Sequence, residues 1–132
     1  MTPNGHTDTI TSLICWEDYL LSSSSDCTIN VWVCTEEETL KVAYTHIEEN
    51  AVLGLYGMID TDAKPILFCL CKDNSVPTYS SCLYRFLERG RLFTRQEVRS
   101  FEIGPGGLFF TGDGTGLLNV WKWLEEPKVP SS

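Results

Sequence analysis

Leu20–Trp32, with the sequence LLSSSSDCTINVW, is the stretch that predicts the fold, because the chain contains two further copies of it. Leu67–Tyr79, LFCLCKDNSVPTY, aligns with it without a gap, and Phe109–Trp121, FFTGDGTGLLNVW, is a third copy. The aromatic residues that end the copies lie 47 and 42 residues apart. The chain is therefore expected to be an array of three similar units.

Each unit is predicted to be a small antiparallel sheet. Helix signals are nearly absent, and short apolar or β-branched runs alternate with clusters of Gly, Pro, Asn, Asp and Ser. The strands predicted in the first unit are Ile10–Cys15, Tyr19–Ser24, Thr28–Cys34 and Leu40–Thr45. A repeat of roughly 40 to 45 residues is that of a four-stranded propeller blade. The predicted fold is all-β, an incomplete propeller of about three antiparallel blades, with units of approximately residues 5–45, 46–93 and 94–123.

Polar residues at fixed places in the first unit resemble a WD40 repeat. Gly5 and His6 form the glycine–histidine pair, Asp26 is the turn aspartate and Trp32 is the terminal tryptophan. The resemblance implies a buried chain of hydrogen bonds through Trp32, Ser22, His6 and Asp26. Such a chain satisfies buried polar groups and selects one strand register.

The other two units keep only part of this pattern. The second retains His46 and Asp73, with Cys69 and Tyr79 at the positions of Ser22 and Trp32. The third retains Thr111 and Trp121, with Thr115 at the aspartate position and no histidine near residues 94–96. Only the first unit is expected to build the whole network.

A serine, a histidine and an aspartate in one network also suggest a hydrolase, which uses them as nucleophile, base and orienting group. The serine lies in the middle of a predicted strand, however, and no GxSxG turn exposes it. Gly112, Gly114 and Gly116 lack the Lys-Ser/Thr ending of a phosphate-binding loop and are interpreted as a hairpin. We therefore expect no enzyme activity, cofactor, metal or small-molecule substrate.

Composition narrows the class of protein further. The net charge of −8 argues against electrostatic capture of nucleic acid, and no apolar run is long enough to span a membrane. The six cysteines show no paired CxxC motif. Cys69 and Cys71 lie in an apolar run, where they are expected to be buried free thiols on one face of a strand. A reducing location, nucleus or cytoplasm, is expected.

Three stretches extend the resemblance to a narrower family. They are GHTDTITSLICWEDYLLS (5–22), ERGRLFTRQEV (88–98) and IGPGGLFFTGDGTG (103–116). They are similar to the C-terminal propeller of plant CCCH zinc-finger proteins that carry WD40 repeats, and the likeness covers residues 5–123. In that family the zinc fingers precede the propeller and supply metal and nucleic-acid binding. This sequence has no Cys-Cys-Cys-His spacing, so neither property is carried over to its residues.

The function expected from these features is a protein-interaction scaffold. Loops that enter the first strand of each unit, together with the tight turns, are predicted to form one face that binds a protein or peptide. The residues predicted for it are Thr7, Asp8, Thr9, Ser25, Glu48, Glu49, Asn50 and Lys72. Because these residues are mostly acidic or polar, a basic peptide is the expected ligand. The alternative is an RNA- or DNA-associated module that uses the arginine-rich segment 85–99, with contacts from Arg89, Arg91 and Arg95.

Both ends of the array are predicted to be open. Three units are too few to close a ring, since propellers start at about four blades. The chain is thus expected to be a fragment of a longer protein, an assembly of copies or a truncated product of limited stability. Pro77 removes a hydrogen-bond donor where an inner strand is expected. Residues 124–132 are predicted to be a disordered tail.

Overall fold

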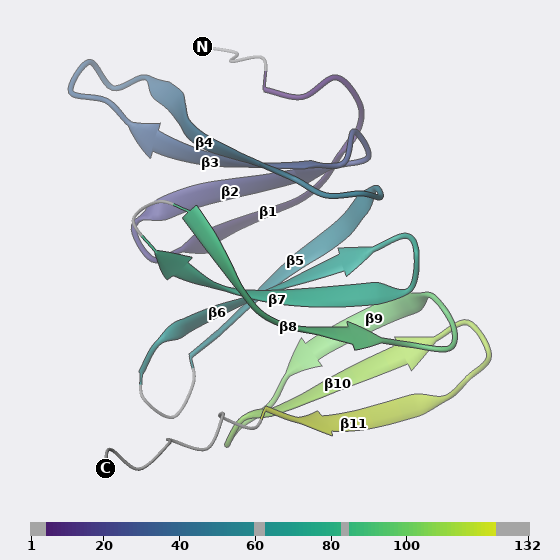
Figure 1. Cartoon of the computed structure of the whole chain (residues 1–132). Helices are drawn as coiled ribbons and strands as arrows, with labels where there is room; N and C mark the ends of the chain where they lie inside the picture. The colour runs from purple at the N-terminus through teal and green to yellow at the C-terminus, as the bar shows by residue number, and fades with distance from the viewer. Residues whose placement is uncertain (1–4, 60–62, 83–84, 124–132) are drawn as a thin grey trace, which may run out of the picture.

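The computed structural model describes residues 5–59, 63–82 and 85–123, without the side chains of residues 81, 82 and 85. Within these ranges the chain forms three antiparallel sheets and no helix, which confirms the all-β prediction (Figure 1). We call the sheets blades 1, 2 and 3. Blade 1 consists of β1 (Ile10–Trp16), β2 (Tyr19–Ser24), β3 (Thr28–Cys34) and β4 (Leu40–Ile47). Blade 2 consists of β5 (Val52–Ile59), β6 (Pro65–Cys71), β7 (Ser75–Cys82) and β8 (Arg85–Phe93). Blade 3 consists of β9 (Val98–Ile103), β10 (Leu108–Asp113) and β11 (Leu118–Lys122).

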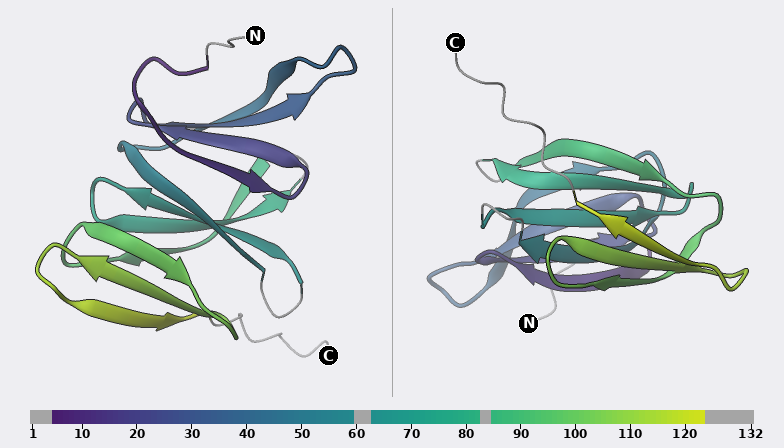
Figure 2. Two further views of the ribbon diagram at one scale, coloured as in Figure 1. Left: turned by 180° about the vertical axis from the view of Figure 1, so that it is seen from behind. Right: turned by 90° about the horizontal axis from the view of Figure 1, so that it is seen from below.

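Each blade is an up-and-down meander, in which every strand pairs with the next one along the chain. The three blades lie one beside the next, with their faces toward one another (Figures 1 and 2). The first strands of neighbouring blades contact each other, β1 with β5 and β5 with β9. The Thr11 hydroxyl also donates a hydrogen bond of 2.6 Å to the Val52 carbonyl across the first junction. This arrangement is that of consecutive blades in an open propeller.

The strand β6 shows why the inner strands are continuously apolar. Its side chains alternate between two clusters: Leu67 and Cys69 pack between blades 1 and 2, whereas Ile66, Phe68 and Leu70 pack between blades 2 and 3. All five are buried. A strand covered on both faces gains from apolar side chains at every position, whereas one facing water on one side alternates.

Blade 2 contains Pro77 in the middle of β7, where the sequence predicted an obstacle. The described ladder between β6 and β7 runs from Ile66↔Ser80 to Phe68↔Thr78 and stops before the proline. On the other side Pro77 pairs with Arg91 of β8. The missing N–H therefore falls beyond the β6 ladder, and the strand forms around it.

Blade 3 has three described strands where four were predicted. Its last strand, β11, forms the free edge, and Leu118 and Val120 are 70% and 61% exposed. On the far face of blade 1, Leu13 is 61% exposed. Among the described residues, the two outer blades thus each keep exposed apolar side chains on the outer face, although Trp32 on that face of blade 1 is buried. The tail predicted for residues 124–132 lies outside the described residues.

Replacing Phe68 tests the packing between blades 2 and 3. Its ring is fully buried and lies 4.8 Å from the ring of Phe109 and 5.3 Å from that of Phe101, between centroids. Phe68→Ala is expected to lower the free energy of unfolding by about 3–5 kcal/mol in urea denaturation, because it removes buried apolar surface and leaves a cavity. Leu118→Ala, at an exposed position, is the control and should change it by less than about 0.5 kcal/mol. Equal effects of the two variants would contradict the packing described.

Candidate interaction surface and the hydrogen bonds that support it

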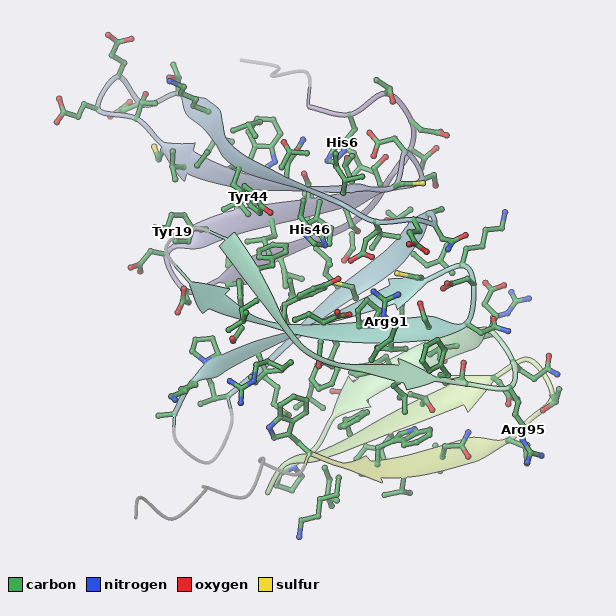
Figure 3. The ribbon with its side chains drawn as sticks, viewed as in Figure 1. His6, Tyr19, Tyr44, His46, Arg91 and Arg95 are labelled. Carbon is green, nitrogen blue, oxygen red and sulfur yellow. The ribbon has the colours of Figure 1, made fainter. Side chains whose placement is uncertain are left out.

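The polar residues expected in blade 1 form one connected chain. The Trp32 indole N–H donates to the Ser22 hydroxyl at 2.8 Å, and Ser22 Oγ lies 2.6 Å from His6 Nε2. On the other side of the imidazole, Nδ1 lies 3.2 Å from Asp26 Oδ2 and 3.0 Å from the Thr28 hydroxyl. Figure 3 labels His6, whose side chain is only 1% exposed. The network thus connects the loop before β1 to β2 and β3.

The donors fix the direction of these hydrogen bonds. Because Ser22 accepts from Trp32, its own proton is free to donate to His6 Nε2, and Nδ1–H then donates to Asp26. Ser22 is 1% exposed, and both its proton and one lone pair are engaged within the protein. Its hydroxyl is therefore a structural bridge in this geometry, without the access that a nucleophile needs.

Asp26 is held as a carboxylate by its donors. Burial alone would raise its pKa, but hydrogen bonds from Thr28, Thr7 and His6 outweigh that effect and lower the pKa from 3.8 to about 2. The Thr7 N–H contributes one of these bonds at 3.0 Å, and the Thr28 N–H another at 2.9 Å. The carboxylate thereby fastens both the entry loop and the β2–β3 turn.

Asn30 and Gly5 complete the site through a hydrogen bond that was not predicted. The Asn30 amide donates to the Gly5 carbonyl at 2.5 Å, and the backbone of Gly5 lies against the Trp32 ring. A Cβ at residue 5 would come within 2.2 Å of Trp32 Cζ2. Glycine is required here because no other residue lets the backbone approach the indole so closely.

Blade 2 builds a different network from the one predicted. His46 Nε2 lies 2.8 Å from Glu48 Oε1 and 3.2 Å from the Tyr79 hydroxyl, which itself donates to Glu48. Glu48 is 7% exposed, so its assignment to the exposed interaction face was wrong. Burial alone would raise the pKa of Glu48, but the bonds from His46 and Tyr79, with the nearby Arg91 cation, lower it. Burial and the Glu48 carboxylate raise the pKa of Tyr79.

Asp73 does not join His46, which corrects their assignment to one network. Its carboxylate accepts the Ser75 N–H at 3.1 Å and the Ser75 hydroxyl at 2.5 Å, and so caps the β6–β7 turn. Asp26 bonds Thr28 in the same way, and Asp113 bonds Thr115. The shared pattern Asp-x-Ser/Thr is visible in the sequence as DCT, DNS and DGT. Asp113 was missed because it precedes the position that aligns with Asp26.

Blade 3 keeps one bond of the network. The Trp121 indole N–H donates to the Thr111 hydroxyl at 2.9 Å, as Trp32 does to Ser22. Among the described residues, no histidine lies in this blade.

The loops predicted to form an interaction face do lie side by side. Backbone bonds join them in turn: Ser25 N–H to the Thr9 carbonyl at 3.0 Å, Glu48 N–H to the Cys27 carbonyl at 2.8 Å and Lys72 N–H to the Ala51 carbonyl at 3.0 Å. We call the remaining predicted set the strand-end surface. It comprises Thr7, Asp8, Thr9, Ser25, Glu49, Asn50 and Lys72, all exposed or partly exposed.

Two arginines of segment 85–99, Arg91 and Arg95, lie apart from each other. Arg91 on β8 forms an ion pair of 3.0 Å with Glu88, and Arg95 lies in the loop after β8, apart from it (Figure 3). Arg89 is partly exposed, and the side chain of Arg85 lies outside the described set.

Five cysteines have described side chains, and all five are free thiols. Cys69 and Cys71 are buried as expected, whereas Cys15 and Cys34 are exposed. Burial raises the pKa of the Cys69 thiol and raises that of Cys71 to about 12. The described residues contain no group of three or more His, Cys, Asp or Glu placed to hold a metal. The same part of the chain has no helix with the length and apolar character needed to cross a membrane.

Comparison with solved structures defines the class of fold as blades of a WD40-type β-propeller. The crystal structure of Sqt1 from Chaetomium thermophilum matches with a TM-score of 0.74 and 19% identity, over 91% of this chain and 32% of that one. Sqt1 from Saccharomyces cerevisiae matches with a TM-score of 0.72 and 13% identity, over 92% of this chain and 33% of that one. Identities this low show the fold alone.

In sequence, the chain is similar to plant CCCH zinc-finger proteins. It is 52% identical over 96 residues to zinc finger CCCH domain-containing protein 63 of Arabidopsis thaliana, and 54% identical over 92 residues to protein 48 of the same plant. It is 52% identical over 90 residues to protein 17 of Oryza sativa subsp. japonica. These matches cover 68–70% of this chain but 20–22% of the relatives, so the chain spans about a fifth of their length. No family model matches the sequence.

The blade 1 network predicts a large effect of a small substitution. Ser22→Ala leaves the Trp32 indole and the His6 imidazole without their shared partner, and should lower the free energy of unfolding by about 1–3 kcal/mol. Ser100→Ala, at an exposed position on β9, is the matched control, with an expected change within about 0.5 kcal/mol. Urea denaturation of the two variants makes the comparison. A loss for Ser22→Ala no greater than that for Ser100→Ala would rule out a stabilising bridge.

The lowered pKa of Asp26 predicts acid sensitivity. A carboxyl whose pKa is lower in the folded than in the unfolded chain stabilises the fold above the unfolded value, and this contribution is lost as the pH falls toward the folded value. The stability difference between the wild type and Asp26→Asn should therefore shrink by about 1–2 kcal/mol between pH 5 and pH 2. Urea denaturation at a series of pH values measures it. A difference that stays constant over this range would contradict the proposed hydrogen bonding of the carboxylate.

Proposed function

We propose that this chain is a non-catalytic scaffold that binds a protein partner through the strand-end surface. The observation that carries the proposal is the construction of that surface: exposed loops stand on buried networks that hold them in place. Asp26 fastens the entry loop of blade 1, and the Glu48–His46–Tyr79 network fastens the connection to blade 2. A preorganised loop surface loses little entropy on binding.

The charge on the surface favours a basic peptide. Asp8 and Glu49 are exposed carboxylates of the strand-end surface. Lys72 is the one cation among the seven residues that define this surface. Asp26 and Asp73, whose pKa values are lowered, add negative charge at the adjoining turns. The chain as a whole carries a net charge of −8. Lysine or arginine side chains on the partner would complement this field.

The relatives supply the context for the proposal. The matched region of the plant proteins named CCCH zinc finger is about a fifth of their length. We propose that the chain is a partial propeller of such a protein, acting in the nucleus or cytoplasm. A nucleic-acid role finds less support, because the Arg91 charge is paired with Glu88. A truncated product without independent function would bind no partner and unfold without a cooperative transition.

Charge reversal tests the surface. Peptides selected from a random display library on the purified chain should be rich in Lys and Arg, with binding that weakens as salt rises. Asp8→Lys combined with Glu49→Lys should reduce their affinity at least about 10-fold in fluorescence anisotropy. Glu36→Lys combined with Glu37→Lys makes the same change of net charge in the exposed β3–β4 hairpin and should have little effect. Failure to select peptides, or equal losses from both pairs, would exclude this surface.

A further inference from the structure

Blades 1 and 2 each receive a side chain from the segment that precedes their first strand. In blade 1, Gly5 lies against Trp32 with its carbonyl bonded to Asn30, and the His6 imidazole bonds to Ser22. In blade 2, His46, labelled in Figure 3, packs on Tyr79, with 4.8 Å between ring centroids. In both blades the preceding segment therefore covers the aromatic residue that ends the repeat, through Gly5 in blade 1 and through His46 in blade 2.

The same place in blade 3 is a cavity of about 450 Å³ that opens to solvent. The lining of the cavity includes Phe93, Arg95, Thr111, Asp113, Asn119 and Trp121. The preceding segment borders the cavity but does not fill it. Phe93 is 71% exposed, and the Thr94 hydroxyl is bonded to the backbone carbonyls of Asn74 and Gln96.

The groups that hold Gly5 and His6 in blade 1 have counterparts in this cavity. Thr111 is 2% exposed, and the one hydrogen bond described for its hydroxyl is accepted from Trp121. Its proton is left to donate, as the Ser22 proton does to His6. Asn119 occupies the register position of Asn30, opposite Thr111, and no partner is found for its amide among the described residues.

We propose that the blade 3 cavity binds a histidine-bearing turn of a partner protein, of the Gly-His kind that blade 1 supplies to itself. The imidazole accepts a hydrogen bond from Thr111, and its remaining N–H points toward the Asp113 carboxylate. The carbonyl of the residue before the histidine accepts from Asn119. That residue is glycine, because a Cβ at the matching place in blade 1 would collide with the indole. The site adjoins the strand-end surface, because Thr94 bonds to Asn74 in the turn that carries Lys72, but its lining shares no residue with that surface.

A short peptide tests the proposal on the full chain. The probe is the capped hexapeptide Gly-His-Thr-Asp-Thr-Ile, the sequence of residues 5–10, and the readout is the NMR signal of the Trp121 indole N–H, assigned with Trp121→Phe. The signal is expected to shift and saturate as peptide is added. Replacing histidine by alanine in the peptide, or Thr111→Val in the chain, should weaken binding at least about 10-fold, the loss that follows from one buried hydrogen bond.

Two further variants separate the outcomes. Asn119→Ala, at an exposed position, also removes a hydrogen bond to the peptide and should weaken binding. It replaces Thr111→Val as the test if Thr111→Val lowers the stability of the fold. Thr9→Val, on the strand-end surface, leaves binding unchanged. The proposal is overturned if the Trp121 signal does not saturate, or if affinity survives both Thr111→Val and Asn119→Ala. Binding that is lost only in Thr9→Val would place the peptide on the strand-end surface and equally refute the cavity.

Discussion

A sheet with two apolar faces must be covered on both, and this constraint governs the molecule. The strand β6 sends Leu67 and Cys69 toward blade 1 and Phe68 toward blade 3, so blade 2 is stable only between two neighbours. At the outer faces of blades 1 and 3 the described residues meet this requirement only in part, since Leu13 and Leu118 are exposed. Stacking of the sheets is therefore the source of the core, and the two outer blades keep exposed apolar side chains.

Apolar stacking does not determine where the strand ends lie, and buried polar networks supply that information. The backbone N–H and C=O groups of the loops at each strand end need hydrogen-bond partners. Asp26 provides them in blade 1, and Glu48 does so at the junction with blade 2. Because an unmatched buried polar group is costly, each network permits one arrangement of its loop. The loops thereby become a rigid surface, while the apolar core below tolerates exchange of one aliphatic side chain for another.

Sequence alone was sufficient for the strands and for one network. The repeat spacing and the runs of β-branched residues predicted the first three strands of blade 1 to within one residue at each end. The blade 1 chain of Trp32, Ser22, His6 and Asp26 was implied by the resemblance of the first unit to a WD40 repeat. Glu48 was misplaced because a charged residue in a connecting loop normally faces water, and its burial depends on Tyr79, which lies 31 residues away. Only the folded chain brings these two together.

Cys69 and Cys71 lie inside blade 2 with raised thiol pKa values, whereas Cys15 and Cys34 are open to solvent. An electrophilic reagent that reacts with thiolates will therefore label the exposed pair readily and the buried pair only when the blades part. Cys69 belongs to the cluster between blades 1 and 2, so its rate of labelling measures how often that junction opens. The protein thus contains a native reporter of the opening of its core, and no label has to be engineered into the chain.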